Sequence, residues 1–187
     1  MILLVNICKE KLHYSEFVKP ICDILEKNEI KYFSKDYKKV GKEDLEKCSK
    51  IIICGTSLYD NDFAKNINFF KWILETDKPI LGICGGMQII GLLFNGKIRK
   101  GTEIGFYSEY FKKGFLGLKE KQEVYHLHNN YIDFTKLQIF EVFCGNEFSQ
   151  AIKHKEKPIY GVLFHPEVRQ KQLIENFCKI IFYESKK

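Results

Sequence analysis

The chain has 187 residues, a formal net charge of +6 and 45% hydrophobic residues, a composition ordinary for a globular protein. Its length suits one domain, so we expect residues 1–187 to form a single domain. The lysines occur in short groups such as 38–39 and 112–113, without a long basic run. This pattern disfavours a nucleic-acid-binding protein.

The seven cysteines are scattered, and no two have the Cys-x-x-Cys spacing of zinc or redox motifs. Their odd number, without a signal peptide, predicts reduced thiols and a cytoplasmic protein. The apolar residues 1–6 are too few for a membrane segment, so we expect no membrane association.

Strand-like and helix-like segments alternate through the first half of the chain. Short apolar runs predict strands at residues 2–7, 50–54 and 79–83, and residues 31–33 predict a further strand. Helical spacing of apolar residues predicts helices between them, at 15–25, 43–48 and 67–74. Pro20 favours a late start of the first helix, because proline is tolerated only near a first turn. The alternation predicts an α/β fold, a three-layer open sheet that is mostly parallel with helices on both faces.

After Asn95-Gly96 the pattern changes. Residues 97–150 are rich in glycine and aromatic residues and have no helical period, which predicts antiparallel strands and hairpins inserted at one edge of the sheet. Residues 149–154 and 159–164 then predict a hairpin, and 170–183 predict a closing amphipathic helix.

The strongest motif is a cysteine at a predicted strand-to-helix turn. Cys84 follows the strand at 79–83 and has Gly82 before it and Gly86 after it, the cysteine counterpart of a nucleophile elbow. Free N–H groups at the start of the helix favour a thiolate, and the N–H of Gly85 points toward an oxyanion formed there. A buried structural cysteine is the alternative interpretation, and it suits the other six cysteines.

A histidine and a carboxylate follow the last predicted strand. His165 and Glu167 stand two residues apart, so in extended backbone their side chains project to the same side. Glu167 can then hold one imidazole nitrogen and leave the other for Cys84. Together the residues predict a nucleophile, a base and a group that orients the base.

The two motifs resemble those of the class I (triad) glutamine amidotransferases. Residues 82–88 read Gly-Ile-Cys-Gly-Gly-Met-Gln and residues 161–167 read Gly-Val-Leu-Phe-His-Pro-Glu, against G-I-C-x-G-x-Q and G-V-Q-F-H-P-E in the family. Residues 151–154 and 157–162 look most like the free-standing glutaminase subunit of archaeal GMP synthase. The resemblance covers the whole chain.

The resemblance implies the catalytic roles. Cys84 attacks the side-chain amide of glutamine and forms a γ-glutamyl thioester. His165 protonates the departing ammonia and then activates water, while Glu167 orients it. Gly55 becomes the second oxyanion donor beside Gly85. Around Gly55, residues 54–57 read Cys-Gly-Thr-Ser, where the family has G-G-P-x-S or N-G-P-G-D.

The resemblance also assigns the substrate-binding residues. Gln88 helps to bind glutamine, and Asn129 and Asn130 belong to the loop that holds the amino-acid end of the substrate. No cofactor and no metal are implied. His126 and His128 share one face of a predicted strand, but no third ligand is evident nearby, which favours two ordinary strand histidines.

The predicted function is therefore that of a glutaminase subunit. It would pass ammonia to a separate ATP-using synthetase subunit, with XMP as a possible acceptor, since the chain carries no Walker-type phosphate loop. Two alternatives stay open: a stand-alone γ-glutamyl hydrolase, and a regulatory subunit that binds glutamine without catalysis.

Overall fold

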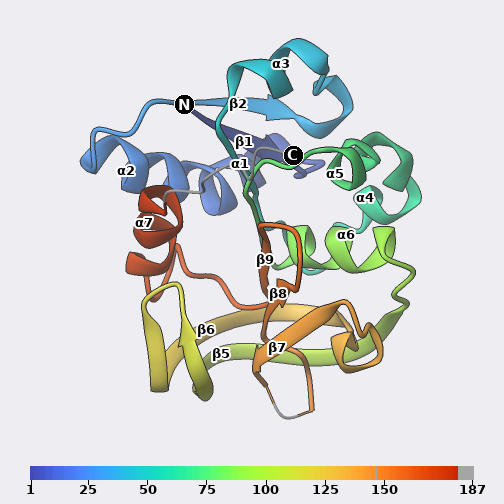
Figure 1. Ribbon diagram of the computed structural model, residues 1–187, viewed down its shortest axis with the longest axis vertical. Coiled ribbons are helices and arrows are strands. Elements are labelled where there is room, and N and C mark those ends of the chain that lie inside the picture. The colour runs from blue at the N-terminus through green and yellow to red at the C-terminus, as the bar shows by residue number, and fades with distance from the viewer. Residues whose placement is uncertain (146, 181–187) are drawn as a thin grey trace.

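The computed structural model describes residues 1–145 and 147–180. Within these ranges a seven-stranded sheet has the strand order β2-β1-β3-β4-β9-β8-β7 (Figure 1). The first five strands of that order pair in parallel, and β8 and β7 join antiparallel at one edge. The strands are β1 (Ile2–Asn6), β2 (Tyr32–Asp36), β3 (Lys50–Ile53), β4 (Ile80–Ile83), β7 (Phe140–Cys144), β8 (Ala151–His154) and β9 (Ile159–Val162). The predicted mostly parallel α/β sheet is confirmed.

Helices cover both faces of this sheet, as Figure 1 shows. One face carries α1 (Lys11–Phe17), α2 (Lys19–Lys27) and α7 (Gln172–Lys179). The other carries α4 (Asp62–Lys65), the 3₁₀ turn η2 (Ile67–Phe70), α5 (Trp72–Glu75) and α6 (Gly85–Leu93). The remaining short elements are η1 (Tyr37–Lys39), α3 (Lys42–Lys47) and η3 (Phe134–Lys136).

Alternation along the strands divides the core into two layers. Leu4 and Ile52 pack into the apolar cluster that contains residues of α1, α2 and α7. Their neighbours Val5 and Ile53 point to the opposite face and pack with residues of α4 and α6. Successive strand side chains point to opposite faces of the sheet. A sheet of uniformly apolar strands therefore needs helices on both of its faces. This explains the three layers.

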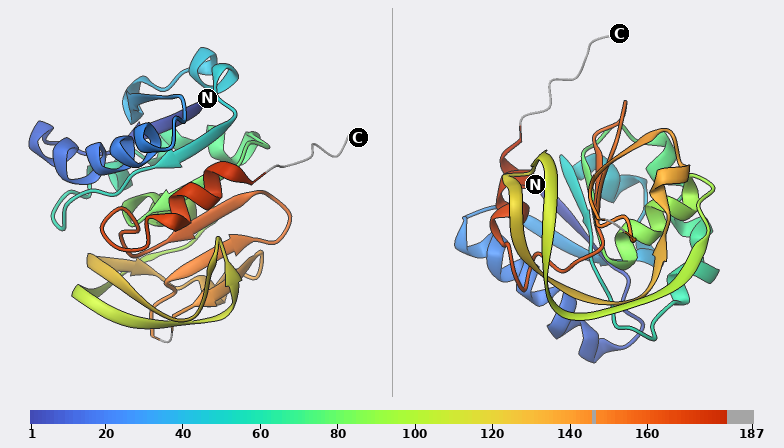
Figure 2. Two further views of the ribbon diagram at one scale, coloured as in Figure 1. Left: turned by 90° about the vertical axis from the view of Figure 1, so that its left-hand side faces the viewer. Right: turned by 90° about the horizontal axis from the view of Figure 1, so that it is seen from below.

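A long hairpin lies across one end of the sheet. Strands β5 (Ile98–Phe115) and β6 (Leu118–Ile132) pair with each other as a separate antiparallel sheet. Figure 2 shows the hairpin curving from the side of α6 to the side of α7. At its tip, the Asn176 side-chain amide of α7 donates to the Leu116 carbonyl over 3.0 Å. The sequence predicted antiparallel strands at an edge, which β7 and β8 form, whereas this hairpin stands apart.

Two predicted helices differ from the structure. The one predicted at 15–25 consists of α1 and α2, divided at Val18, and it begins earlier than expected. Pro20 lies in the first turn of α2, where its missing N–H costs no helical hydrogen bond. The helix predicted at 67–74 is divided into η2 and α5. Residues 181–183 of the predicted closing helix lie outside the described residues. Within the described ranges, every helix is too short or too polar to cross a membrane.

Candidate active site

Cys84 stands at the turn between β4 and α6 in a strained conformation. Its φ is 49° and its ψ is −105°, values that a residue with a Cβ rarely adopts. Its N–H donates to the Val162 carbonyl over 2.8 Å, which ties the turn to the end of β9. The flanking glycines permit close packing: a Cβ on Gly82 would meet the Gly86 backbone at 2.6 Å, and one on Gly86 would meet the Ile53 carbonyl oxygen at 2.4 Å. The surroundings therefore determine the turn.

His165 and Glu167 form a buried pair just beyond β9. The Nδ1 of His165 lies 2.7 Å from Oε1 of Glu167, and the two residues are 1% and 2% exposed. The His165 backbone N–H donates to the Tyr125 carbonyl of β6 over 2.8 Å. Since Glu167 occupies Nδ1, the buried Nε2 is left without a hydrogen-bond partner. That nitrogen is available for acid–base chemistry.

The charges around His165 favour its protonated form. Burial lowers the pKa of His165, but the carboxylate of Glu167 and the proximity of Cys84 raise it by more, so its pKa stands well above the usual value. A protonated imidazole beside Cys84 can give its proton to a leaving group. The arrangement therefore supports acid–base chemistry by His165.

Gly55 brings a third chain segment to the same place. A Cβ there would meet Cε1 of His165 at 2.7 Å and Cβ of Cys84 at 3.6 Å, so a side chain cannot be accommodated without displacement. Asp60 holds the turn that carries Gly55. One of its carboxylate oxygens accepts from the Thr56 hydroxyl over 2.8 Å and from the Lys9 N–H over 2.6 Å.

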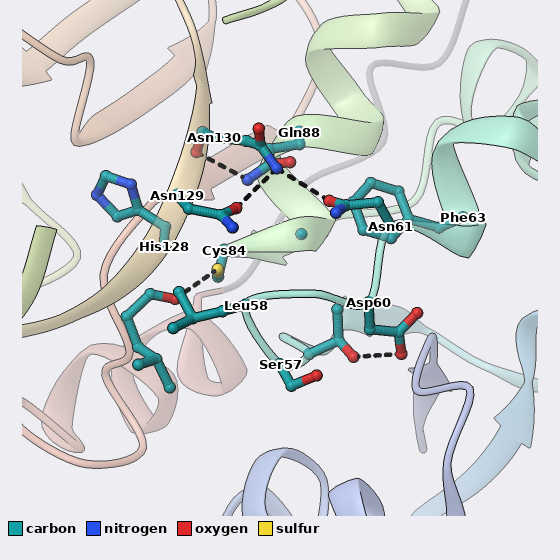
Figure 3. A pocket seen from close by; sticks show the side chains of 13 residues that line it. Ser57, Leu58, Asp60, Asn61, Phe63, Cys84, Gln88, His128, Asn129 and Asn130 are labelled. Atoms are coloured by element: carbon teal, nitrogen blue, oxygen red, sulfur yellow. Dashed lines mark hydrogen bonds between the residues drawn. The ribbon is translucent and has the colours of Figure 1, made fainter. Parts of the chain in front are cut away.

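A pocket opens above Cys84 (Figure 3). The Cys84 thiol faces the Leu127 carbonyl of β6 at 3.7 Å. The Gln88 side-chain N–H donates to the Asn130 carbonyl over 3.0 Å, and the Asn130 side chain donates to Oδ1 of Asn61 over 3.0 Å. These bonds join α6, β6 and the loop after β3 around the pocket.

Two polar atoms at this pocket are buried and unpartnered. They are Oε1 of Gln88 and Oδ1 of Asn130. A buried acceptor without a partner is unfavourable, so such atoms are suited to receive the donors of a bound polar molecule. The pocket therefore offers a nucleophile together with hydrogen-bond acceptors.

The structure brings all the predicted site residues into one region. Those that line the pocket are Cys84, Gly85, Gln88, Asn129 and Asn130. Gly55 packs against Cys84 and His165, and Glu167 pairs with His165.

Among the neighbours that sequence reasoning missed are Phe17, Asp60 and Asn61. The Phe17 ring lies 5.5 Å from the His165 ring, and the other two residues line the pocket. An Asp-Asn pair after a glycine turn was the available signal for Asp60 and Asn61, but loops commonly contain such pairs.

Comparison with known proteins gives a consistent family relationship. The model of the family described as glutamine amidotransferase class-I matches residues 13–183. A glutamine-hydrolysing GMP synthase subunit of Methanococcus aeolicus is 35% identical over 130 residues, which are 64% of this chain and 69% of the relative. The same subunit of Methanocaldococcus jannaschii is 33% identical over 133 residues, 66% of this chain and 71% of the relative.

A GMP synthase of Spiroplasma kunkelii is 36% identical over 138 residues, which span 68% of this chain but 26% of that longer protein. Among solved structures, one from Thermoplasma acidophilum, described as a GMP synthase subunit, superposes with a TM-score of 0.83 at 21% identity, over 95% of this chain and 91% of the other. A glutamine amidotransferase of Thermotoga maritima gives a TM-score of 0.69 at 21% identity, over 94% of this chain and 81% of the other. These structural matches support the fold.

Proposed function

The chain belongs to the class I glutamine amidotransferases, and from this membership we propose that it hydrolyses glutamine through Cys84, His165 and Glu167. The observation that carries the proposal is the strained Cys84 at the β4–α6 turn, next to a buried histidine with one free nitrogen. Backbone strain of this kind persists only where the surrounding structure enforces it, and it is concentrated at functional sites.

The first half of the reaction acylates the cysteine. The Cys84 thiolate attacks the side-chain carbonyl carbon of glutamine, and the carbonyl becomes a tetrahedral oxyanion. As the C–N bond breaks, Nε2 of His165 donates its proton to the leaving nitrogen, and ammonia departs. The product on the protein is a γ-glutamyl thioester.

The second half releases glutamate. Neutral His165 now takes a proton from water, and the resulting hydroxide attacks the thioester carbonyl. The C–S bond breaks, so glutamate leaves and the thiolate and the imidazolium are both regenerated. Glu167 holds Nδ1 throughout, which keeps Nε2 directed at the reaction.

Backbone N–H groups at two turns would stabilise the oxyanion. Gly85 is the first residue of α6, and the first N–H groups of a helix have no intrahelical acceptor. Gly55 supplies the second N–H from the turn after β3, where it packs against both His165 and Cys84. Hydrogen-bond donors aimed at this point stabilise the negative charge that develops there.

Glutamine would be oriented by the outer part of the pocket. We assign the ammonium group of the substrate to the acceptors there, which include the unpartnered oxygens of Gln88 and Asn130. Asn129 lines the same wall. This places the side-chain amide of glutamine toward Cys84.

We further propose that the ammonia is passed to a separate synthetase subunit, with XMP as the acceptor. Support comes from the 33–35% identity to proteins named as glutamine-hydrolysing subunits of GMP synthase. The β5 strand also presents exposed apolar side chains, with Phe106 60% and Tyr110 62% exposed, which suits a protein contact.

The test is glutamine hydrolysis by the purified chain, alone and with an XMP-aminating synthetase. Glutamate release and acid-trapped labelled enzyme from [¹⁴C]glutamine are expected, and both should disappear in Cys84→Ala. Release of glutamate from γ-glutamyl peptides at a rate equal to that from glutamine would favour a γ-glutamyl hydrolase. Glutamine binding without any hydrolysis, with the synthetase present, would indicate a regulatory subunit.

A further inference from the structure

A second group of chemically active side chains lies on the β5–β6 hairpin next to the pocket, whose lining includes His128. His126 and His128 project from one face of β6, and Glu103 stands on β5 directly across from His128. One ligand atom from each of the three lies within 4.8 Å of the others. The sequence showed no third ligand beside the histidine pair because Glu103 is 23 positions before His126 and is brought there by strand pairing.

The spacing of these atoms suits a small metal ion. Nδ1 of His126 lies 3.5 Å from Oε2 of Glu103, and Nε2 of His128 lies 2.9 Å from the same oxygen. Ligands at about 2.1 Å from a tetrahedral ion stand about 3.4 Å apart. Small shifts of the Glu103 carboxylate would therefore allow all three residues to bind one ion.

The outer ring nitrogens of the two histidines face oxygen atoms. Nδ1 of His128 lies 3.2 Å from the Gly101 carbonyl, and Nε2 of His126 lies 3.4 Å from Oε1 of Glu109. Gln150 donates over 2.5 Å to Oε2 of Glu103, which is the oxygen that faces both histidines. Histidines that ligate metals characteristically direct their second nitrogen at a carbonyl or a carboxylate, which fixes the ring orientation. His128 has this contact, and Nε2 of His126 lies close to the Glu109 carboxylate without a hydrogen bond.

An independent observation is the state of His126. Its side chain is fully buried, and neither ring nitrogen has a hydrogen-bond partner. A buried imidazole in this state is unfavourable, and a metal on Nδ1 would satisfy that nitrogen while the N–H on Nε2 turns to Glu109. The carboxylates of Glu103 and Glu109 are 15% and 12% exposed, so an ion can enter from solvent.

We propose that Glu103, His126 and His128 bind one divalent transition-metal ion of the zinc type. Two imidazoles and one carboxylate favour zinc over magnesium or calcium, which prefer oxygen ligands alone. The ion would fix the strand whose backbone borders the pocket, because Leu127 faces the Cys84 thiol and the Asn130 carbonyl accepts from Gln88. Figure 3 shows His128 on the side of β6 away from Asn129, so the ion would lie behind the pocket wall.

The proposal is tested by titrating the metal-stripped chain with Zn²⁺ and Co²⁺ in a Cys84→Ser background, which removes the pocket thiol as a competing ligand. One equivalent is expected to bind, with a rise in Tm, and Co²⁺ should give visible bands without a sulfur-to-cobalt charge-transfer band. Mg²⁺ at the same concentration should leave Tm unchanged.

The variants locate the ion. Glu103→Gln and His128→Gln should each weaken Zn²⁺ binding by more than about 100-fold, because loss of an outer partner alone costs about 10–100-fold. Glu109→Gln, which removes an outer partner, should weaken Zn²⁺ binding by about 10–100-fold. His13→Gln, which removes a histidine from α1, is the matched control and should bind as the parent does. Circular dichroism confirms that each variant is folded.

Three outcomes would overturn the proposal. One is the absence of a binding equivalent in the folded parent chain, which would mean that the cluster is an ion-pair network. Another is unchanged affinity in folded Glu103→Gln and His128→Gln. The third is a sulfur-to-cobalt charge-transfer band, which would assign the metal to cysteines. None of these bears on glutamine hydrolysis, so the proposed function is tested separately.

Discussion

The carboxyl ends of the parallel strands and the β5–β6 hairpin contribute to the pocket in different ways. Cys84 and His165 lie at the strand ends and are both buried. Cys84 has a strained backbone, His165 is paired with Glu167, and the backbone N–H of each donates to a carbonyl of a strand. The hairpin contributes backbone carbonyls on its inner face, while its outer face exposes Ile104, Phe106 and Tyr110. Under the proposed function, the chemistry would therefore lie at the strand ends, while the hairpin would share substrate recognition with α6.

The sharpest test of this division is removal of the nucleophile. Cys84→Ser should lower kcat for glutamine hydrolysis on the order of 10⁴-fold or more, because a neutral hydroxyl replaces a thiolate. Steady-state release of glutamate measures the loss. Cys178→Ser on α7 is the matched control and should retain the parental rate. A Cys84→Ser chain of parental activity would place the chemistry elsewhere.

The next effect concerns the carboxylate behind His165. Glu167→Gln should lower kcat/KM by about 10²–10⁴-fold, because the amide cannot stabilise the imidazolium or select the correct tautomer. The charge of Glu167 contributes to raising the pKa of His165, so its removal lowers that pKa. The alkaline limb of the pH–rate profile should accordingly move to lower pH. Substitution of the exposed Glu156 by Gln is the control and should change neither kcat/KM nor the alkaline limb. If the alkaline limb does not move in Glu167→Gln, the role assigned to Glu167 is contradicted.

Gly55→Ala tests the turn after β3. The added methyl group would collide with the His165 ring at 2.7 Å and displace the turn that carries the second oxyanion donor. Loss of one such donor costs about 10²–10³-fold in kcat. Gly114→Ala on the hairpin, where a Cβ meets nothing within 4 Å, is the control. Equal kcat in both variants would remove Gly55 from the site.

Gln88→Met tests the substrate-binding face of the pocket. It removes one acceptor and the hydrogen bond to the Asn130 carbonyl, so KM for glutamine should rise by about tenfold with a smaller change in kcat. Initial rates over a range of glutamine concentrations separate the two constants. A fall in kcat at constant KM would show instead that Gln88 acts in the chemical step.

The smallest effect on the isolated chain is expected from substitutions on the outer face of the hairpin, which we propose contacts the partner. We expect the chain alone to be weakly active and its kcat to rise when the partner binds, because residues 54–57 lack the adjacent glycine and the proline that would preset the turn. Phe106→Ser should leave the basal rate unchanged and reduce that rise. If the isolated chain hydrolyses glutamine as fast as the complex, the idea of partner activation is wrong.

Prediction from the sequence was most accurate where the site depends on local backbone geometry. Glycines around Cys84 predicted the turn. The pairing of His165 with Glu167 was predicted from extended backbone, and the 2.7 Å contact is present but is formed in a turn at residues 166–168. The helix predicted at 15–25 was less accurate, since the effect of Pro20 depends on where the preceding helix ends. Asp60 was missed because its partners, Lys9 and Thr56, come from two different loops.

The sequence by itself determined the layered α/β fold and the elements that carry Cys84, His165 and Glu167, because apolar periodicity and glycine turns act over a few neighbouring residues. The tertiary structure decided what meets across long separations. It put Gly55 against His165, Leu127 opposite Cys84 and Glu103 beside His126. Such contacts depend on strand pairing and on how a separate hairpin packs over the sheet, which no local pattern of residues specifies.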